Sequence, residues 1–251
     1  FCSAACPLKC HRNARLRFWL GNEGRLIFKC WAGCSKLDVL RSLGLGWRDC
    51  FSGGEVPDRP PEGGGARYRY TDEAGVLLYE TVRLEPGHRG RDKDFRQRRP
   101  KPGGGWEWSP GDVRRVLYRL PDLLAAAPLE AVFVVAGEKD VESLRALGLV
   151  ATTNVCGERA PWLDAYSEVL CGRRVTVVSD QDSAGRRHAD EVVGSLVRHG
   201  AAGVRVAELP AKDATDFLVG LRRDGVTDPE SLRDEWWAAV SCEPEWAAQW
   251  A

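Results

Sequence analysis

Residues 177–185 read Val-Val-Ser-Asp-Gln-Asp-Ser-Ala-Gly, and this stretch decides the fold. The apolar run that ends here predicts a buried strand, and the residues after it open a predicted helix. Asp180 and Asp182 lie one residue apart just past the strand, so their side chains project on the same side of the backbone. Hard divalent cations prefer oxygen ligands, so such a pair can hold a metal ion beside a phosphate group.

Two further acidic turns accompany this pair: Val-Val-Ala-Gly-Glu-Lys-Asp at residues 134–140 and Lys-Asp-Ala-Thr-Asp at residues 212–216. Between and around these turns, apolar runs alternate with helical patterns. Strands are predicted near 131–136, 149–153, 174–179 and 203–208, and helices near 138–147, 160–170 and 184–199. This rhythm predicts an α/β fold of βαβ units with a largely parallel sheet. Ligands of such sheets bind at the carboxyl ends of strands, where the first two acidic turns lie.

Charge is distributed unevenly along a chain of 251 residues with a formal net charge of zero. Residues 83–101 contain eight Lys or Arg against three Asp or Glu, whereas residues 129–251 contain thirteen against twenty-one. This asymmetry suits a protein that grips phosphates with one part and binds metal with another; ordinary surface variation is the alternative. With no apolar run long enough to span a bilayer and no signal peptide, we expect no membrane partner.

Five of the nine cysteines lie within residues 1–34, which indicates a local metal site. Cys6-x3-Cys10 and Cys30-x3-Cys34 form two close pairs, separated by a predicted hairpin over 16–20 and 25–29. This construction is typical of a zinc ribbon, and a module of about fifty residues needs the metal because its core is small. Unrelated buried cysteines are the alternative.

The second zinc ligand is the open one, because His11 adjoins Cys10 and Cys2 precedes Cys6, so either can replace a member of the first pair. Ser35 is expected to cap a helix over 36–43 that Gly44 ends. The remaining cysteines are expected to be free thiols, which suits a reducing, cytoplasmic compartment.

A linker rich in Gly and Pro covers residues 51–65. Beyond it, Tyr68 to Thr71 and Val76 to Leu84 predict a hairpin, and Leu117 to Ala127 predicts a helix. Basic side chains with interspersed aromatic residues lie between them and suit a single-stranded template and an incoming triphosphate. The candidates for this contact are Arg83, Lys93, Arg96, Arg98, Arg99 and Lys101. A solvated charged loop is the alternative.

Together the three acidic turns resemble the Toprim domain of primases, topoisomerases and related nucleases. The stretch from Gly24 to Ser35 likewise resembles the zinc-binding domain of bacterial and phage primases, although Lys9 stands where many relatives have His. The order of parts matches phage- and plasmid-type primases. The resemblance implies a zinc ribbon over 1–50, a basic N-terminal subdomain of the polymerase core over 66–128, a Toprim domain over 129–225 and a helical tail over 226–251.

What the resemblance implies for the site is a set of carboxylates that bind Mg²⁺ or Mn²⁺ at Asp180, Asp182, Asp213 and Asp216, with Asp140 closing the first motif. The chain departs from the pattern at Ala136, where Toprim primases carry Glu as a metal ligand or general acid/base. Three interpretations stay open: an engineered substitution, a natural inactive or altered homologue, or compensation by Glu138.

The resemblance implies a DNA primase, a nucleotidyltransferase that makes short RNA primers on single-stranded DNA from nucleoside triphosphates. A metal-dependent Toprim nuclease and a catalytically inactive single-strand-binding homologue are the alternatives. Because no Gly-x4-Gly-Lys-Ser/Thr motif is present, we expect no helicase motor in these residues, although a replicative helicase is a candidate partner. The chain begins at Phe1 and contains no Met, so we expect a fragment of a longer protein.

Overall fold

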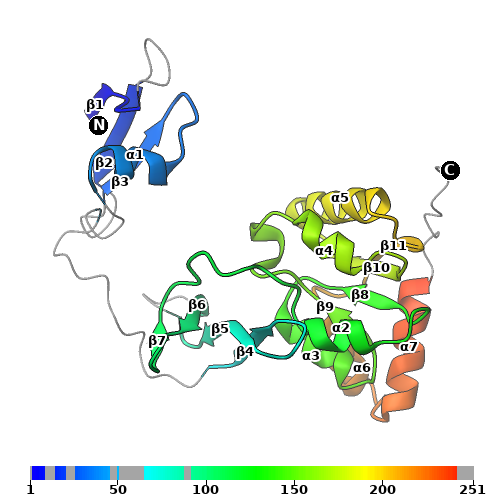
Figure 1. Cartoon of the computed structure of the whole chain (residues 1–251). Helices are drawn as coiled ribbons and strands as arrows, with labels where there is room; N and C mark the ends of the chain where they lie inside the picture. The colour runs from blue at the N-terminus through cyan, green and yellow to red at the C-terminus, as the bar shows by residue number, and fades with distance from the viewer. Residues whose placement is uncertain are drawn as a thin grey trace. The chain divides into compact units, whose positions relative to one another are not determined.

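A computed structural model describes residues 2–8, 15–20, 26–45, 50, 65–87 and 92–241. The chain divides into two compact units, Phe1–Glu62 and Gly63–Ala251, which are described separately (Figure 1). No helix among the described residues is both long and apolar enough to cross a membrane.

The first unit is a three-stranded antiparallel sheet with one helix. Its strands are β1 (Cys2–Ala5), β2 (Arg15–Leu20) and β3 (Leu26–Cys30), in the order β1-β2-β3. Helix α1 (Lys36–Ser42) begins where Ser35 Oγ accepts a hydrogen bond from the Asp38 backbone N–H at 3.1 Å. The predicted hairpin and capped helix are therefore confirmed, while β1 was not expected.

The second unit begins with an antiparallel sheet in the order β4-β5-β6-β7. Its strands are β4 (Arg67–Thr71), β5 (Leu77–Leu84), β6 (Asp94–Pro100) and β7 (Trp106–Glu107). The predicted hairpin is confirmed as β4 and β5. In the described part of the basic stretch, residues 94–98 are not a solvated loop, because they pair in register with β5.

A four-stranded parallel sheet forms the centre of the second unit, in the order β11-β10-β8-β9. Its strands are β8 (Val132–Val134), β9 (Val150–Thr152), β10 (Arg174–Ser179) and β11 (Gly203–Glu208). These strands and their parallel pairing confirm the α/β prediction. Consecutive strand residues alternate between two cores: Phe133 packs in one, and Val132 and Val134 in the other.

Helices cover both faces of this sheet (Figure 1). On one face lie α4 (Asp164–Val169) and α5 (Ser183–Arg198); on the other lie α3 (Glu138–Arg145), α6 (Ala214–Arg223) and α7 (Pro229–Ser241). Helix α2 (Leu120–Ala125) precedes β8 and is shorter than the expected 117–127.

Aromatic residues join these layers. Trp236 of α7 is fully buried and meets Phe133 edge to face, with ring centroids 5.4 Å apart. Trp236 therefore has a packing role, whereas Trp246 and Trp250 lie outside the described residues. On the opposite side of the same core, Tyr70 and Tyr79 of the antiparallel sheet stack at 4.6 Å. The two sheets therefore share one hydrophobic core.

Candidate metal and catalytic sites

Three cysteines of the first unit come together from separate turns. The Sγ atoms of Cys6, Cys30 and Cys34 all lie within 4.8 Å of one another, with 3.9 Å between Cys6 and Cys34. Burial raises the pKa of the Cys30 thiol, but hydrogen bonds from the Ala32 and Cys34 backbone and from the neighbouring thiols outweigh it and lower the pKa to about 7. Three thiols so placed fit a structural zinc ion.

The fourth ligand stays a prediction. Cys10 and His11 lie outside the described residues, and so does the side chain of Cys2. The structure thus brings together three of the four predicted cysteines and leaves the choice among the other three candidates open.

At the carboxyl end of β10 the two aspartates of the opening motif have different environments. Burial, followed by the charges of Asp140, Glu158, Asp213 and Asp182, raises the pKa of Asp180 to about 6. Asp182 instead caps α5: its Oδ1 accepts hydrogen bonds from the backbone N–H groups of Ala184 at 2.9 Å and Gly185 at 2.8 Å. These bonds lower the pKa of Asp182. Asp180 is therefore surrounded by other negative charges, whereas the Asp182 carboxylate is fixed in direction and readily ionised.

Glycine is required where α5 passes this turn. A Cβ at Gly185 would lie 2.7 Å from both Asp180 Cβ and the Asp180 carbonyl oxygen. The Asp180 loop can therefore approach the first turn of α5 only because residue 185 has no side chain.

Asp140 is buried in the first turn of α3 and is tied to α6. Its Oδ1 accepts hydrogen bonds from the Thr215 backbone N–H at 3.0 Å and from Thr215 Oγ1 at 2.7 Å. Burial raises the pKa of Asp140, and the charge of Asp213 adds to the effect. Asp213 caps α6 by accepting a hydrogen bond from the Asp216 N–H at 2.7 Å, while Asp216 itself is exposed.

The predicted acidic residues thus lie in one region but not in a tight cluster. Asp140, Asp182 and Asp213 all act on the Asp180 carboxyl. Among the described residues, only the three cysteines form a group whose ligand atoms lie within 4.8 Å of one another, so the carboxylates are spread more widely than that.

Position 136 lies between β8 and Gly137, the N-cap of α3, and its Ala offers no ligand. Glu138 is buried, and its Oε1 accepts a 2.8 Å hydrogen bond from the hydroxyl of Tyr70. Another residue, which the sequence did not single out, lies close by: Glu158 in the short 3₁₀ helix η4 (Gly157–Arg159). Glu158 lies in a Cys-Gly-Glu-Arg turn that matches no known motif, so the sequence did not indicate its place near the site.

The six basic candidates divide into paired and unpaired side chains. Arg98 is buried, binds Glu80 through Nε at 2.9 Å and Nη2 at 2.8 Å, and stacks 3.9 Å over the ring of Trp106. Arg99 pairs with Glu107 at 2.8 Å and Arg83 pairs with Glu85.

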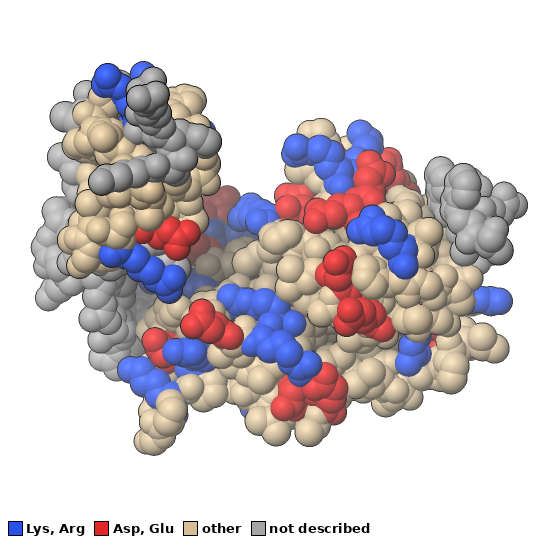
Figure 2. Space-filling view, turned by 45° about the horizontal axis from the view of Figure 1, so that its top comes forward, with Lys and Arg blue, Asp and Glu red and all other residues tan. Residues whose placement is uncertain are grey.

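Three candidates remain without an ion pair among the described residues: Lys93, Arg96 and Lys101. Figure 2 shows acidic and basic side chains interspersed over the face of the second unit that it presents, so no single-sign field covers that face. Basic contacts must therefore be assigned side chain by side chain.

Comparisons with known proteins identify the class of fold. No family model matches the chain, and no curated protein matches it in sequence. Solved structures do match, and the two described next are bacterial primases. The fold is therefore that of a bacterial-type primase core preceded by a primase-type zinc-binding unit.

Two of these structures align with a TM-score of at least 0.50. The E. coli primase catalytic core gives 0.51 at 17% identity, over 71% of this chain and 52% of that one. The Aquifex aeolicus primase, with its zinc-binding and RNA polymerase domains, gives 0.50 at 16% identity, over 84% of this chain and 50% of that one. This chain spans about half the length of both.

Proposed function

We propose that the chain is a DNA primase, a DNA-directed RNA polymerase that makes short RNA primers on single-stranded DNA. The observation that carries the proposal is the placement of Asp180 at the carboxyl end of β10, beside Asp140, Asp213 and Asp182, in a primase-type fold. The carboxyl ends of parallel strands are where such sheets bind ligands. Crowded carboxylates there favour a divalent cation, whose charge relieves their repulsion.

In this proposal Asp180 and Asp182 hold Mg²⁺ or Mn²⁺, which when bound neutralises the triphosphate and activates the attacking 3′-hydroxyl. Asp140 and Asp213 add negative charge behind them. The two hydrogen bonds to Asp182 leave its Oδ2 free of the cap and fix its direction. Asp216 is the least involved, because it is not among the charges named as raising the pKa of Asp180.

The basic residues have two different roles, phosphate binding and stabilisation of the antiparallel sheet. Lys93, Arg96 and Lys101 attract the template and the incoming triphosphate, because their charges have no acidic partner in the described chain. Arg98 instead stabilises the antiparallel sheet through Glu80 and Trp106. Arg83 and Arg99 reach phosphate only by giving up an ion pair.

The rest of the proposal concerns the domain order. The zinc ribbon (1–50) reads the single-stranded template, and the linker (51–65) tethers it. The basic subdomain (66–128) and the Toprim domain (129–225) form the polymerase core. The C-terminal helical tail covers 226–251, and its helix α7 packs on the sheet. A replicative helicase is the proposed partner of the longer protein.

Primer synthesis tests this function directly. The chain is incubated with single-stranded DNA, labelled NTPs and Mg²⁺ or Mn²⁺, in parallel with Asp180→Asn and Ala136→Glu variants. Short NTP-dependent oligomers that disappear in Asp180→Asn are expected. Cleavage of the strand without NTPs would identify a nuclease instead, and binding with neither reaction in any variant would identify a non-catalytic module.

A further inference from the structure

The loop after β9 contacts Ala136, the position at which Toprim primases carry Glu. Gly157 has a φ of +50°, and a Cβ built on it would overlap the carbonyl oxygen of Ala136. The side-chain amide of Asn154, which is buried, donates a 3.0 Å hydrogen bond to the Gly157 carbonyl oxygen and fixes this turn. Residues 136 and 157 are therefore in backbone contact, although 20 residues separate them in the sequence.

The residue that follows this contact is Glu158. Its side chain is half-buried, and Oε2 is shielded from solvent without any hydrogen-bond donor among the described residues. A carboxylate oxygen without water or a donor is unfavourable, and such atoms in folded proteins call for a partner such as an ion. The orphaned oxygen fits a site for a cation.

The Glu158 charge also acts on the acidic site. After burial and Asp140, its charge is the next contribution that raises the pKa of Asp180. Glu138, the other glutamate near position 136, has a buried carboxylate that already accepts a hydrogen bond from Tyr70. Of these two glutamates, Glu158 is the one whose carboxylate has an oxygen shielded from solvent and without a hydrogen-bond partner among the described residues.

We infer that Glu158 supplies the carboxylate that position 136 lacks, and that it binds the divalent cation together with Asp180. This inference rests on the proposed function, since it assigns a ligand to the same metal. It selects a fourth interpretation of Ala136, in which the acidic group has moved from the end of β8 to the neighbouring loop.

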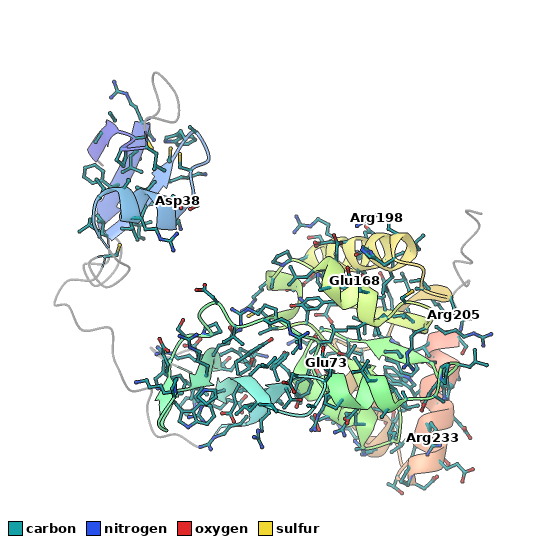
Figure 3. All side chains as sticks on the ribbon, viewed as in Figure 1. Asp38, Glu73, Glu168, Arg198, Arg205 and Arg233 are labelled. Atoms are coloured by element: carbon teal, nitrogen blue, oxygen red, sulfur yellow. The ribbon has the colours of Figure 1, made fainter. Side chains whose placement is uncertain are left out.

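Metal binding tests the inference without relying on activity. The full chain is first loaded with one equivalent of Zn²⁺ for the cysteines and excess Zn²⁺ is removed, because Zn²⁺ would otherwise compete for the carboxylates. Free Mn²⁺ is then followed by electron paramagnetic resonance during a titration. Glu158→Gln is expected to weaken Mn²⁺ binding by about tenfold or more. Glu168→Gln is the matched control, because Glu168 is exposed on α4 and is labelled there in Figure 3. The double variant Ala136→Glu/Glu158→Gln is expected to regain most of the affinity.

The outcomes separate the two proposals. Unchanged Mn²⁺ affinity in a folded Glu158→Gln variant, with affinity lost in Asp180→Asn, would overturn the role of Glu158 and leave the metal site in place. Normal Mn²⁺ binding that depends on Glu158, without oligomers from NTPs, would instead overturn the primase proposal alone. Far-ultraviolet circular dichroism checks folding, and if Glu158→Gln fails to fold, Glu158→Asp replaces it and is expected to keep weakened binding.

Discussion

The hydroxyl of Tyr70 donates a hydrogen bond to Glu138 across the junction of the two sheets of the second unit, over 2.8 Å and with both side chains buried. Burial, together with the neighbouring Glu138 charge, raises the pKa of Tyr70 well above its ordinary value, so the phenol remains a donor at every physiological pH. The bond fixes the first turn of α3 to strand β4.

Tyr70→Phe is expected to destabilise the second unit by about 1–3 kcal/mol, because it leaves a buried carboxylate without its donor. Denaturant unfolding measures the change. Tyr79→Phe is the matched control, since the Tyr79 hydroxyl only reaches the Val116 carbonyl oxygen at 3.5 Å and a smaller loss is expected. Equal losses in both variants would show that the Tyr70 hydroxyl contributes nothing special.

The raised pKa of Asp180 makes the stability of the folded protein depend on pH. Its pKa in the folded protein is about 6, above the roughly 3.9 of an unfolded chain, so the folded state binds the proton more tightly. Ionisation of Asp180 therefore disfavours the folded state above pH 6, and this cost vanishes as the pH falls toward 4. Asp180→Asn is expected to raise the thermal midpoint at pH 8 and to leave it nearly unchanged at pH 4.

The same pKa governs the metal. Mn²⁺ competes with the proton on Asp180, so Mn²⁺ affinity is expected to fall as the pH drops through 6. A titration at pH 5, 6, 7 and 8 measures it. An affinity independent of pH over this range would show that Asp180 is not a ligand.

Arg98 and Arg96 are expected to respond in opposite ways to replacement by Ala. Loss of Arg98 leaves the buried Glu80 carboxylate with only the longer 3.9 Å ion pair to Arg69, which is expected to cost about 3 kcal/mol of unfolding free energy. Loss of Arg96 should leave stability nearly unchanged and weaken single-strand binding, with the salt slope smaller by about 0.7. Fluorescence anisotropy against salt concentration measures binding. Unchanged stability in Arg98→Ala would contradict the structural role of Arg98, and normal strand binding by Arg96→Ala would contradict the binding role of Arg96.

The zinc site is tested by metal content. Elemental analysis of the purified chain is expected to find one zinc ion per chain, and Cys30→Ser is expected to lose it. Cys171→Ser, which replaces an exposed free cysteine of the second unit, should keep it. Because the metal stabilises the small core around Phe28 and Leu40, the first unit should become protease-sensitive without it. Zinc retained by Cys30→Ser would exclude Cys30 as a ligand.

The strands of the parallel sheet could be predicted from the sequence because their hydrophobic patterns are local. The apolar runs of β10 and β11 coincide with the expected 174–179 and 203–208, and the cap at Ser35 was visible in the residue itself. Strand β6 was missed because its arginine-rich pattern acquires a strand's environment only through distant partners. Arg98 is buried by Glu80, 18 residues earlier, and by the ring of Trp106.

The candidate site also combines residues that local motifs predict with a residue that only a distant contact brings in. Asp140, Asp180 and Asp213 were found from motifs that end strands or begin helices, and the structure brings them into electrostatic contact. The approach of Glu158 to Ala136 depends on a backbone contact between Gly157 and Ala136, which no periodicity or spacing in the sequence encodes.

The first turn of α3 is anchored at two points that face different parts of the protein. Glu138 is held by Tyr70 of the antiparallel sheet, and Asp140, two residues later, is held by Thr215 of α6. Both bonds are buried, so a rotation of one sheet against the other must break at least one of them. The first turn of α3 therefore connects the antiparallel sheet, which carries the basic residues, to Asp140 and α6 through two buried hydrogen bonds.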